Sequence, residues 1–107
     1  MNLGIVIHAS RPEPAVFARR LAEEAESRGH TLVGDEDTAR LLQREIGAGD
    51  PDVLIASGGD GTVLAAVQRA LLLDVPVLAF NLGTIGFLAD AEPDDLELVL
   101  DALGSGH

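Results

Sequence analysis

The sequence predicts a three-layer α/β domain with a mostly parallel sheet, and three observations support this fold class. Short apolar runs with the length of buried strands alternate with longer stretches in which apolar residues recur at helical spacing. Glycine-rich turns follow the third and the fourth apolar run, at the edge of a parallel sheet where ligands bind. The length of 107 residues and the hydrophobic content of 47% fit one domain with one core.

Composition narrows the classes of function. The chain has a net charge of -11 and contains no lysine, so its field repels nucleic acid and we expect no nucleic-acid partner. It has no cysteine, which excludes disulfides and thiolate metal sites and fits a reducing compartment. No apolar stretch approaches the roughly 20 residues of a membrane span. We therefore expect a cytoplasmic protein without a membrane partner.

The first third of the chain predicts one β-α-β unit. Leu3 to His8 is an apolar run that fits a buried strand. Pro14 is suited to the first position of a helix that extends to about Arg28, where Gly29 provides a C-cap. His30 to Val33 fits a short second strand, parallel to the first. The apolar stripe of this helix consists of Phe17, Leu21, Ala22 and Ala25.

The middle of the chain predicts a short helix and then a second β-α-β unit. Thr38 to Ile46 fits a short helix with Leu41, Leu42 and Ile46 turned inward. The acidic residues 35–37 before it fit a solvated loop and helix start. The third strand begins at Val53, after a turn at Gly47 to Pro51. Its helix runs from Thr62 to Leu73 and is closed by Asp74. Val75 to Phe80 is the expected fourth strand, with Pro76 near its beginning.

The stretch from Gly58 to Gly61 joins the third strand to its helix, and its residue types fit phosphate binding. Glycine lets a ligand approach the backbone amides, and the helix N-terminus favours an anion. Asp60 would repel a phosphate unless it removes a proton or meets a metal ion, so we interpret it as a catalytic base or a magnesium partner. The alternative is a tight turn in which the aspartate caps the helix.

A second glycine loop follows the fourth strand at the same sheet edge. Gly83 and Gly86 make this segment permissive, and the side chain of Asn81 offers both a donor and an acceptor. Phe87 either stacks on a base or packs in the core. Two glycine loops are thus predicted to face one crevice.

Several other chemistries fail on residue types. A P-loop requires a lysine, which the chain lacks, and the dinucleotide fingerprint G-x-G-x-x-G is absent. Zinc is improbable with three histidines far apart in the sequence and no cysteine, and we predict no metal ligand set. His8 and Arg11 lie at the expected ligand edge, where either a phosphate contact or a plain loop role is open.

The motif SGGDGT and the later segment NLGTIGFL resemble the N-terminal domain of the NAD kinases. That family has a GGDGT loop and, one helix and one strand later, an N-x-G-x-x-G-F-L segment. Diacylglycerol and sphingosine kinases also carry GGDGT, and the GFL segment separates the two groups. The resemblance covers most of the chain and implies a Rossmann-like domain.

The resemblance also implies roles for individual residues. Asp60 would take the proton from the adenosine ribose 2′-hydroxyl of NAD as that oxygen attacks the γ-phosphate of ATP, which brings Mg²⁺ with it. Gly61 would lie against the dinucleotide, Phe87 would line the adenine pocket, and NADP would be the product. The loop around the phosphates would be shaped by Gly58, Gly59 and Thr62, and the crevice framed by Asn81 and Gly83.

The resemblance also implies a second, β-rich domain, which these 107 residues do not include. We expect residues 1–103 to form the nucleotide-binding domain, ending in a helix from Glu92 to Leu103, and residues 104–107 to resemble a linker. An apolar patch should then be exposed for a C-terminal domain or for another copy in a homo-oligomer. The alternatives are a lipid kinase domain of the diacylglycerol or sphingosine type and a non-catalytic nucleotide-binding or assembly fragment.

Overall fold

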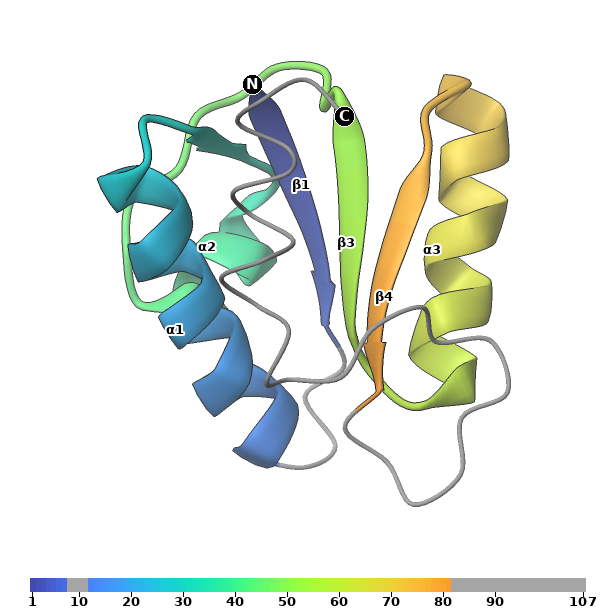
Figure 1. The fold of residues 1–107 in the computed structure, drawn as a ribbon, viewed down its shortest axis with the longest axis horizontal. Coiled ribbons are helices and arrows are strands. Elements are labelled where there is room, and N and C mark those ends of the chain that lie inside the picture. Colours follow the sequence, from blue (N-terminus) through green and yellow to red (C-terminus); the bar gives the residue numbers. More distant parts are fainter. Residues whose placement is uncertain (8–11, 82–107) are drawn as a thin grey trace.

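The computed structural model describes residues 1–7 and 12–81, which form a sheet of four parallel strands in the order β2-β1-β3-β4. The strands and helices alternate along the chain (Figure 1). Their bounds are β1 Asn2–Ile7, α1 Pro12–Ser27, β2 Thr31–Val33, α2 Glu36–Leu42, β3 Val53–Gly58, α3 Asp60–Leu73 and β4 Val77–Asn81. In this part of the chain, no helix has the length and apolarity to cross a membrane.

The helices cover both faces of the sheet, which confirms the predicted three-layer α/β class. α1 and α2 lie on one face and α3 lies on the other (Figure 1). Every residue of β3 is buried, as expected for a central parallel strand. Its side chains alternate: Val53 and Ile55 pack into the core under α1, and Ala56 packs under α3.

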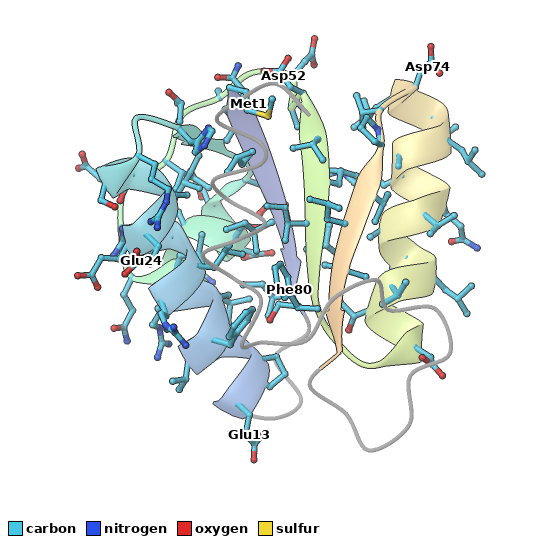
Figure 2. The ribbon with its side chains drawn as sticks, in the orientation of Figure 1. Met1, Glu13, Glu24, Asp52, Asp74 and Phe80 are labelled. Atoms are coloured by element: carbon cyan, nitrogen blue, oxygen red, sulfur yellow. The ribbon has the colours of Figure 1, made fainter. Side chains whose placement is uncertain are left out.

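The core on the α1 face is the larger one and contains the predicted helix stripe. All four apolar residues predicted for this stripe are buried. The ring centroids of Phe17 and Phe80 lie 5.1 Å apart, so this contact packs α1 against β4. Figure 2 shows Phe80 on the side of the sheet that faces α1.

α1 begins two residues earlier than predicted, at Pro12, and ends as predicted. Proline is tolerated in the first turn of a helix, where backbone N–H groups have no partner within the helix. Gly29 has a φ of +84°, and its N–H donates to Glu26 O while the N–H of His30 donates to Ala25 O. This pair of bonds is a Schellman motif, so the C-cap prediction is confirmed.

α2 is shorter than the predicted helix at its C-terminal end. Asp35 caps it by accepting a hydrogen bond of 2.8 Å from the backbone N–H of Thr38, and this bond lowers the pKa of the Asp35 carboxyl below 3.8. The helix stops at Gln43, which adopts a left-handed φ of 56°. Ile46 lies beyond the helix yet still packs partly buried against the core, and Leu42 is fully buried.

β4 begins at Val77, later than predicted, because the backbone N–H of Val75 is hydrogen-bonded to the end of α3. Asp74 closes the helix, as predicted, and adopts a left-handed conformation, while the N–H of Val75 donates to Ala70 O. The carbonyl of Pro76 then accepts a bond from the N–H of Leu54. Regular strand pairing therefore starts at Val77.

Candidate functional site

The carboxyl ends of β1 and β3 form a topological switch point. The two strands are neighbours, with Ile7 paired to Ser57, but the helix after β1 covers one face of the sheet and the helix after β3 covers the other (Figure 1). β4 ends at the same edge, where Asn81 pairs with Gly58. Open α/β sheets bind ligands at such a crevice, so this edge is the candidate site.

Gly58 is required by the fold itself. It ends β3 with a φ of +152°, a conformation that other residues rarely adopt. A Cβ at this position would lie 2.7 Å from Oγ1 of Thr62, whose residue is 5% exposed. Thr62 therefore packs beneath the loop, and the pair fixes how the strand turns into α3.

At Gly59 and Gly61, unlike at Gly58, packing against the described residues does not require a glycine. A Cβ on either would meet no heavy atom of that part of the chain within 4 Å. Gly61 lies in the first turn of α3 without a positive φ, where alanine would favour the helix. Their missing side chains leave backbone amides at the helix N-terminus open to a ligand.

Asp60 is the first residue of α3, and one of its carboxylate oxygens lacks a hydrogen-bond partner in the described part of the chain. Oδ1 is buried and accepts no hydrogen bond from residues 1–7 or 12–81. A buried acceptor without a donor is costly in a native protein and calls for a ligand hydroxyl, a cation or water. Gly59 holds the N-cap position and makes no side-chain cap bond. The alternative in which Asp60 caps the helix is therefore wrong.

Ser57 connects this edge to α1. Its side chain is fully buried, and its hydroxyl donates a hydrogen bond of 3.0 Å to the carbonyl of Pro14 in the first turn of α1. Both helix N-termini thus lie at the same sheet edge. Pro12 and Pro14 remove two backbone donors from α1, whereas the first turn of α3 contains no proline. An anion is therefore better bound by α3.

The rest of the predicted site lies outside the described residues or is described only in its backbone. Asn81 is placed by its strand pairing with Gly58. Gly83 and Phe87 fall in residues 82–107, and His8 and Arg11 in residues 8–11, all outside the described residues. In the part of the chain that the structure describes, no three His, Cys, Asp or Glu side chains form a metal-binding group.

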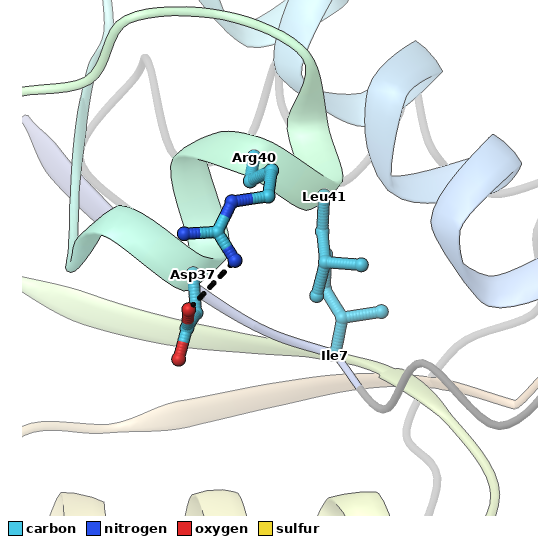
Figure 3. Close-up of a pocket in the computed structure, with 4 residues that line it drawn as sticks. All are labelled: Ile7, Asp37, Arg40 and Leu41. Atoms are coloured by element: carbon cyan, nitrogen blue, oxygen red, sulfur yellow. Dashed lines mark hydrogen bonds and ion pairs between the residues drawn. The ribbon is translucent and has the colours of Figure 1, made fainter.

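A cavity that sequence reasoning missed lies on the opposite face of the sheet from α3. It has a volume of about 310 Å³ and is lined by Ile7, Asp37, Arg40 and Leu41 (Figure 3). Arg40 forms an exposed ion pair of 3.2 Å with Asp37, three residues before it in α2. Ile7 ends β1, so the cavity adjoins the switch point. No motif in the sequence marks it.

Comparison with known proteins agrees with this geometry. Residues 18–107 match the ATP-NAD kinase N-terminal domain. The chain belongs to this family. The match includes β3, α3 and the loop between them, so the family's shared region contains the residues from Gly58 to Thr62.

Three curated relatives of this NAD kinase family member are named NAD kinase. The chain is 35% identical to the NAD kinase of Methanoregula boonei over 99% of its own length, and 34% identical to that of Pyrococcus furiosus over 100%. It is 36% identical to the NAD kinase of Mycolicibacterium paratuberculosis over 91%. The chain spans only 40%, 41% and 38% of these three relatives, respectively.

The fold also matches a solved structure. The crystal structure of yeast NADH kinase complexed with NADH superposes with a TM-score of 0.74 at 22% identity. The match covers 98% of this chain and 38% of the yeast chain. At this identity the likeness concerns the fold, which it confirms as the α/β arrangement predicted from the sequence.

Proposed function

We propose that this chain is the catalytic N-terminal part of an NAD kinase, which transfers the γ-phosphate of ATP to the adenosine ribose 2′-hydroxyl of NAD and forms NADP. The observation that carries the proposal is the buried Oδ1 of Asp60, which has no hydrogen-bond partner among residues 1–7 and 12–81. It lies at the start of α3 between two glycines that no described residue crowds. Membership of the family supports the same activity. A cytoplasmic location stays a prediction.

In this proposal Asp60 is the general base. Its carboxylate accepts the proton of the 2′-hydroxyl while that oxygen forms a bond to the γ-phosphorus, and the bond from the γ-phosphorus to the bridging oxygen of ADP breaks. Oδ1 suits this task because it lacks a donor among the described residues. Mg²⁺ enters with ATP as part of the substrate and neutralises phosphate charge.

The neighbouring residues would position the two nucleotides. The amides at Gly59 and Gly61 face an approach that no described side chain blocks, which suits phosphate or ribose contacts. Gly58 and Thr62 would fix the loop from beneath, as their close packing supports. Asn81, beside Gly58 in the sheet, would border the crevice. Gly83 and Phe87 keep their predicted places in the crevice and the adenine pocket as proposals.

Completion of the site by further polypeptide is part of the proposal. The chain spans about 40% of the relatives that it matches, so a C-terminal domain or a second copy would supply the rest of the nucleotide pocket. Within the chain, residues 1–103 would be the nucleotide-binding domain and residues 104–107 a linker-like tail. A lipid kinase and a non-catalytic binding fragment are the alternatives that an assay must separate.

The decisive experiment measures NADP formation from NAD and Mg-ATP. It compares wild type with Asp60→Asn, and with Asp74→Asn as a matched control at the exposed C-cap of the same helix. Both the 107-residue chain and a longer polypeptide that continues it with the rest of the Pyrococcus furiosus relative are assayed. Loss of the general base should lower the rate roughly 10²- to 10⁴-fold, whereas the control should retain activity.

Three results would count against the proposal. Equal rates for wild type and Asp60→Asn would remove Asp60 from the chemistry. Phosphorylation of diacylglycerol or sphingosine instead of NAD would favour the lipid kinase alternative. Nucleotide binding without turnover in either polypeptide would favour the non-catalytic fragment.

A further inference from the structure

Ser57 places a fully buried hydroxyl near the end of β3, in apolar surroundings. Its two partners in the sheet are Ile7 of β1 and Phe80 of β4. Phe80 is part of the core on the α1 face, and Ile7 packs against that core. A hydroxyl in such surroundings costs free energy unless it is hydrogen-bonded. The bond of 3.0 Å to the carbonyl of Pro14 meets this need and directs the side chain toward the first turn of α1.

The carbonyl of Pro14 does not need this bond for the helix to form. In an α-helix a carbonyl accepts from the N–H four residues later, which here belongs to Ala18 within α1. Removal of the Ser57 hydroxyl therefore leaves no buried carbonyl without a donor. Alanine would also fit the buried strand, as it does at Ala56 in β3. Packing and backbone hydrogen bonding thus do not require a serine at this position.

The last two residues of β3 contact the first turns of two different helices. Ser57 binds the first turn of α1, whereas Gly58 packs closely against Thr62 in the first turn of α3. Figure 1 shows that α1 and α3 begin at the same end of the sheet, on opposite faces. Asp60 lies in the same first turn as Thr62. The end of β3 therefore sets the first turn of α1 relative to the turn that carries Asp60.

We propose that Ser57 is a positioning residue of the proposed kinase site. Its bond to Pro14 holds the first turn of α1 in place beside the Asp60 turn, so that a nucleotide bound at the switch point keeps its 2′-hydroxyl at the Asp60 carboxylate. Ser57 itself neither touches the nucleotide nor accepts a proton. The role rests on the proposed function. Orientation of this kind matters because a misplacement of about 1 Å between reacting groups can cost roughly 10²-fold in rate.

Steady-state kinetics of NADP formation test the role, in the shorter of the two polypeptides described above that is active. Ser57→Ala should lower kcat about tenfold or more and change the KM for NAD and for ATP less than about threefold. Ser57→Thr keeps the hydroxyl and should recover most of the lost kcat. The matched control is Ser27→Ala, which removes an exposed serine hydroxyl that donates 2.7 Å to the Glu24 carbonyl at the other end of α1. It should leave kcat unchanged.

Two measurements on the 107-residue chain need no activity. Thermal melts should show a fall in Tm of less than about 8 °C for Ser57→Ala, as expected for one hydrogen bond. Amide hydrogen exchange should be at least about tenfold faster in Ser57→Ala at Val63, whose N–H donates to Gly59 O in the first turn of α3. Exchange should stay unchanged at Val75, whose N–H donates to Ala70 O at the far end of the same helix.

Failure of the positioning role and failure of the proposed function give different results. An active wild type with unchanged kcat in Ser57→Ala would overturn the role alone, as would equal losses of kcat in Ser57→Ala and Ser27→Ala. A folded Ser57→Thr chain as slow as Ser57→Ala would also overturn it. Absence of NADP formation by wild type would refute the proposed function; equal exchange at Val63 in wild type and Ser57→Ala would then show that Ser57 does not fix the Asp60 turn.

Discussion

Replacement of Gly61 by alanine should separate the stability of this domain from its ligand binding. Gly61 is exposed in the first turn of α3, has no positive φ, and a Cβ there contacts nothing within 4 Å among the described residues. Alanine loses less backbone entropy than glycine, so Gly61→Ala should stabilise the fold by about 0.5 kcal/mol. That gain corresponds to a rise in Tm of roughly 2–4 °C for a domain of this size.

The same methyl group should weaken nucleotide binding. It would occupy the side from which a phosphate or ribose reaches the amides of the α3 N-terminus, and those hydrogen bonds do not tolerate much lengthening. Loss of one hydrogen bond to a charged group costs about 1.5–3 kcal/mol, which is roughly a tenfold to hundredfold increase in Kd. Isothermal titration with Mg-ATP and with NAD, beside a thermal melt, measures both effects.

Gly29→Ala is the matched control for this prediction. A Cβ at Gly29 would also meet no described heavy atom within 4 Å, but the φ of +84° is strained for alanine. Gly29 precedes β2 and so lies at the amino end of the strands, away from the site at their carboxyl ends. This variant should lose about 1–2 kcal/mol without a change in Kd. If Gly61→Ala binds both nucleotides as tightly as wild type, the open approach at Gly61 is not a ligand contact and the reasoning fails.

Two further predictions concern stability. Asp35→Ala removes the N-cap of α2 and should lower the free energy of unfolding by about 1 kcal/mol at neutral pH. Folding lowers the pKa of Asp35, so the cap contributes its full stability above the ordinary pKa of 3.8. The stability difference between variant and wild type should therefore shrink as the pH falls through the lower native pKa. Urea titrations of both chains from pH 7 to pH 2 check this, and a pH-independent difference would contradict it. Phe80→Ala leaves a cavity at a fully buried site beside Phe17 and should lower the free energy of unfolding by about 3–5 kcal/mol. Phe80→Leu fills much of that cavity and should recover much of the loss in the same urea titration. Equal losses for the two variants would show that side-chain volume is not the cause.

Local sequence patterns determined most of the secondary structure. The central strand, the α1 stripe and the Gly29 cap were predictable because apolar periodicity and a glycine in the left-handed region act over a few neighbouring residues. The strand-loop-helix order around Asp60 was predictable for the same reason. The family motif within it supplied a chemical role that the residue types alone left open between a base and a metal partner.

Helix and strand ends were less predictable because backbone groups near them have competing partners. Thr38 to Ile46 has a helical pattern, but the chain leaves the helix at Gln43 and still buries part of Ile46 against the core. The N–H of Val75 serves the end of α3 and not the sheet, so β4 begins later than its apolar run. These choices depend on which partner lies near in space.

The sequence by itself determined the fold class, the glycine loop and the acid within it, because those features depend on residue type and spacing. Only the tertiary structure decided that Asp60 begins α3 with a buried oxygen that no described residue hydrogen-bonds, since burial depends on how strand and helix pack. It also decided that Thr62 leaves no room for a Cβ at Gly58, whereas a Cβ at Gly61 would meet no described residue. Likewise, it decided that Leu64, Leu71 and Leu72 of α3 are exposed. Glycines that look alike in sequence therefore differ by what surrounds them.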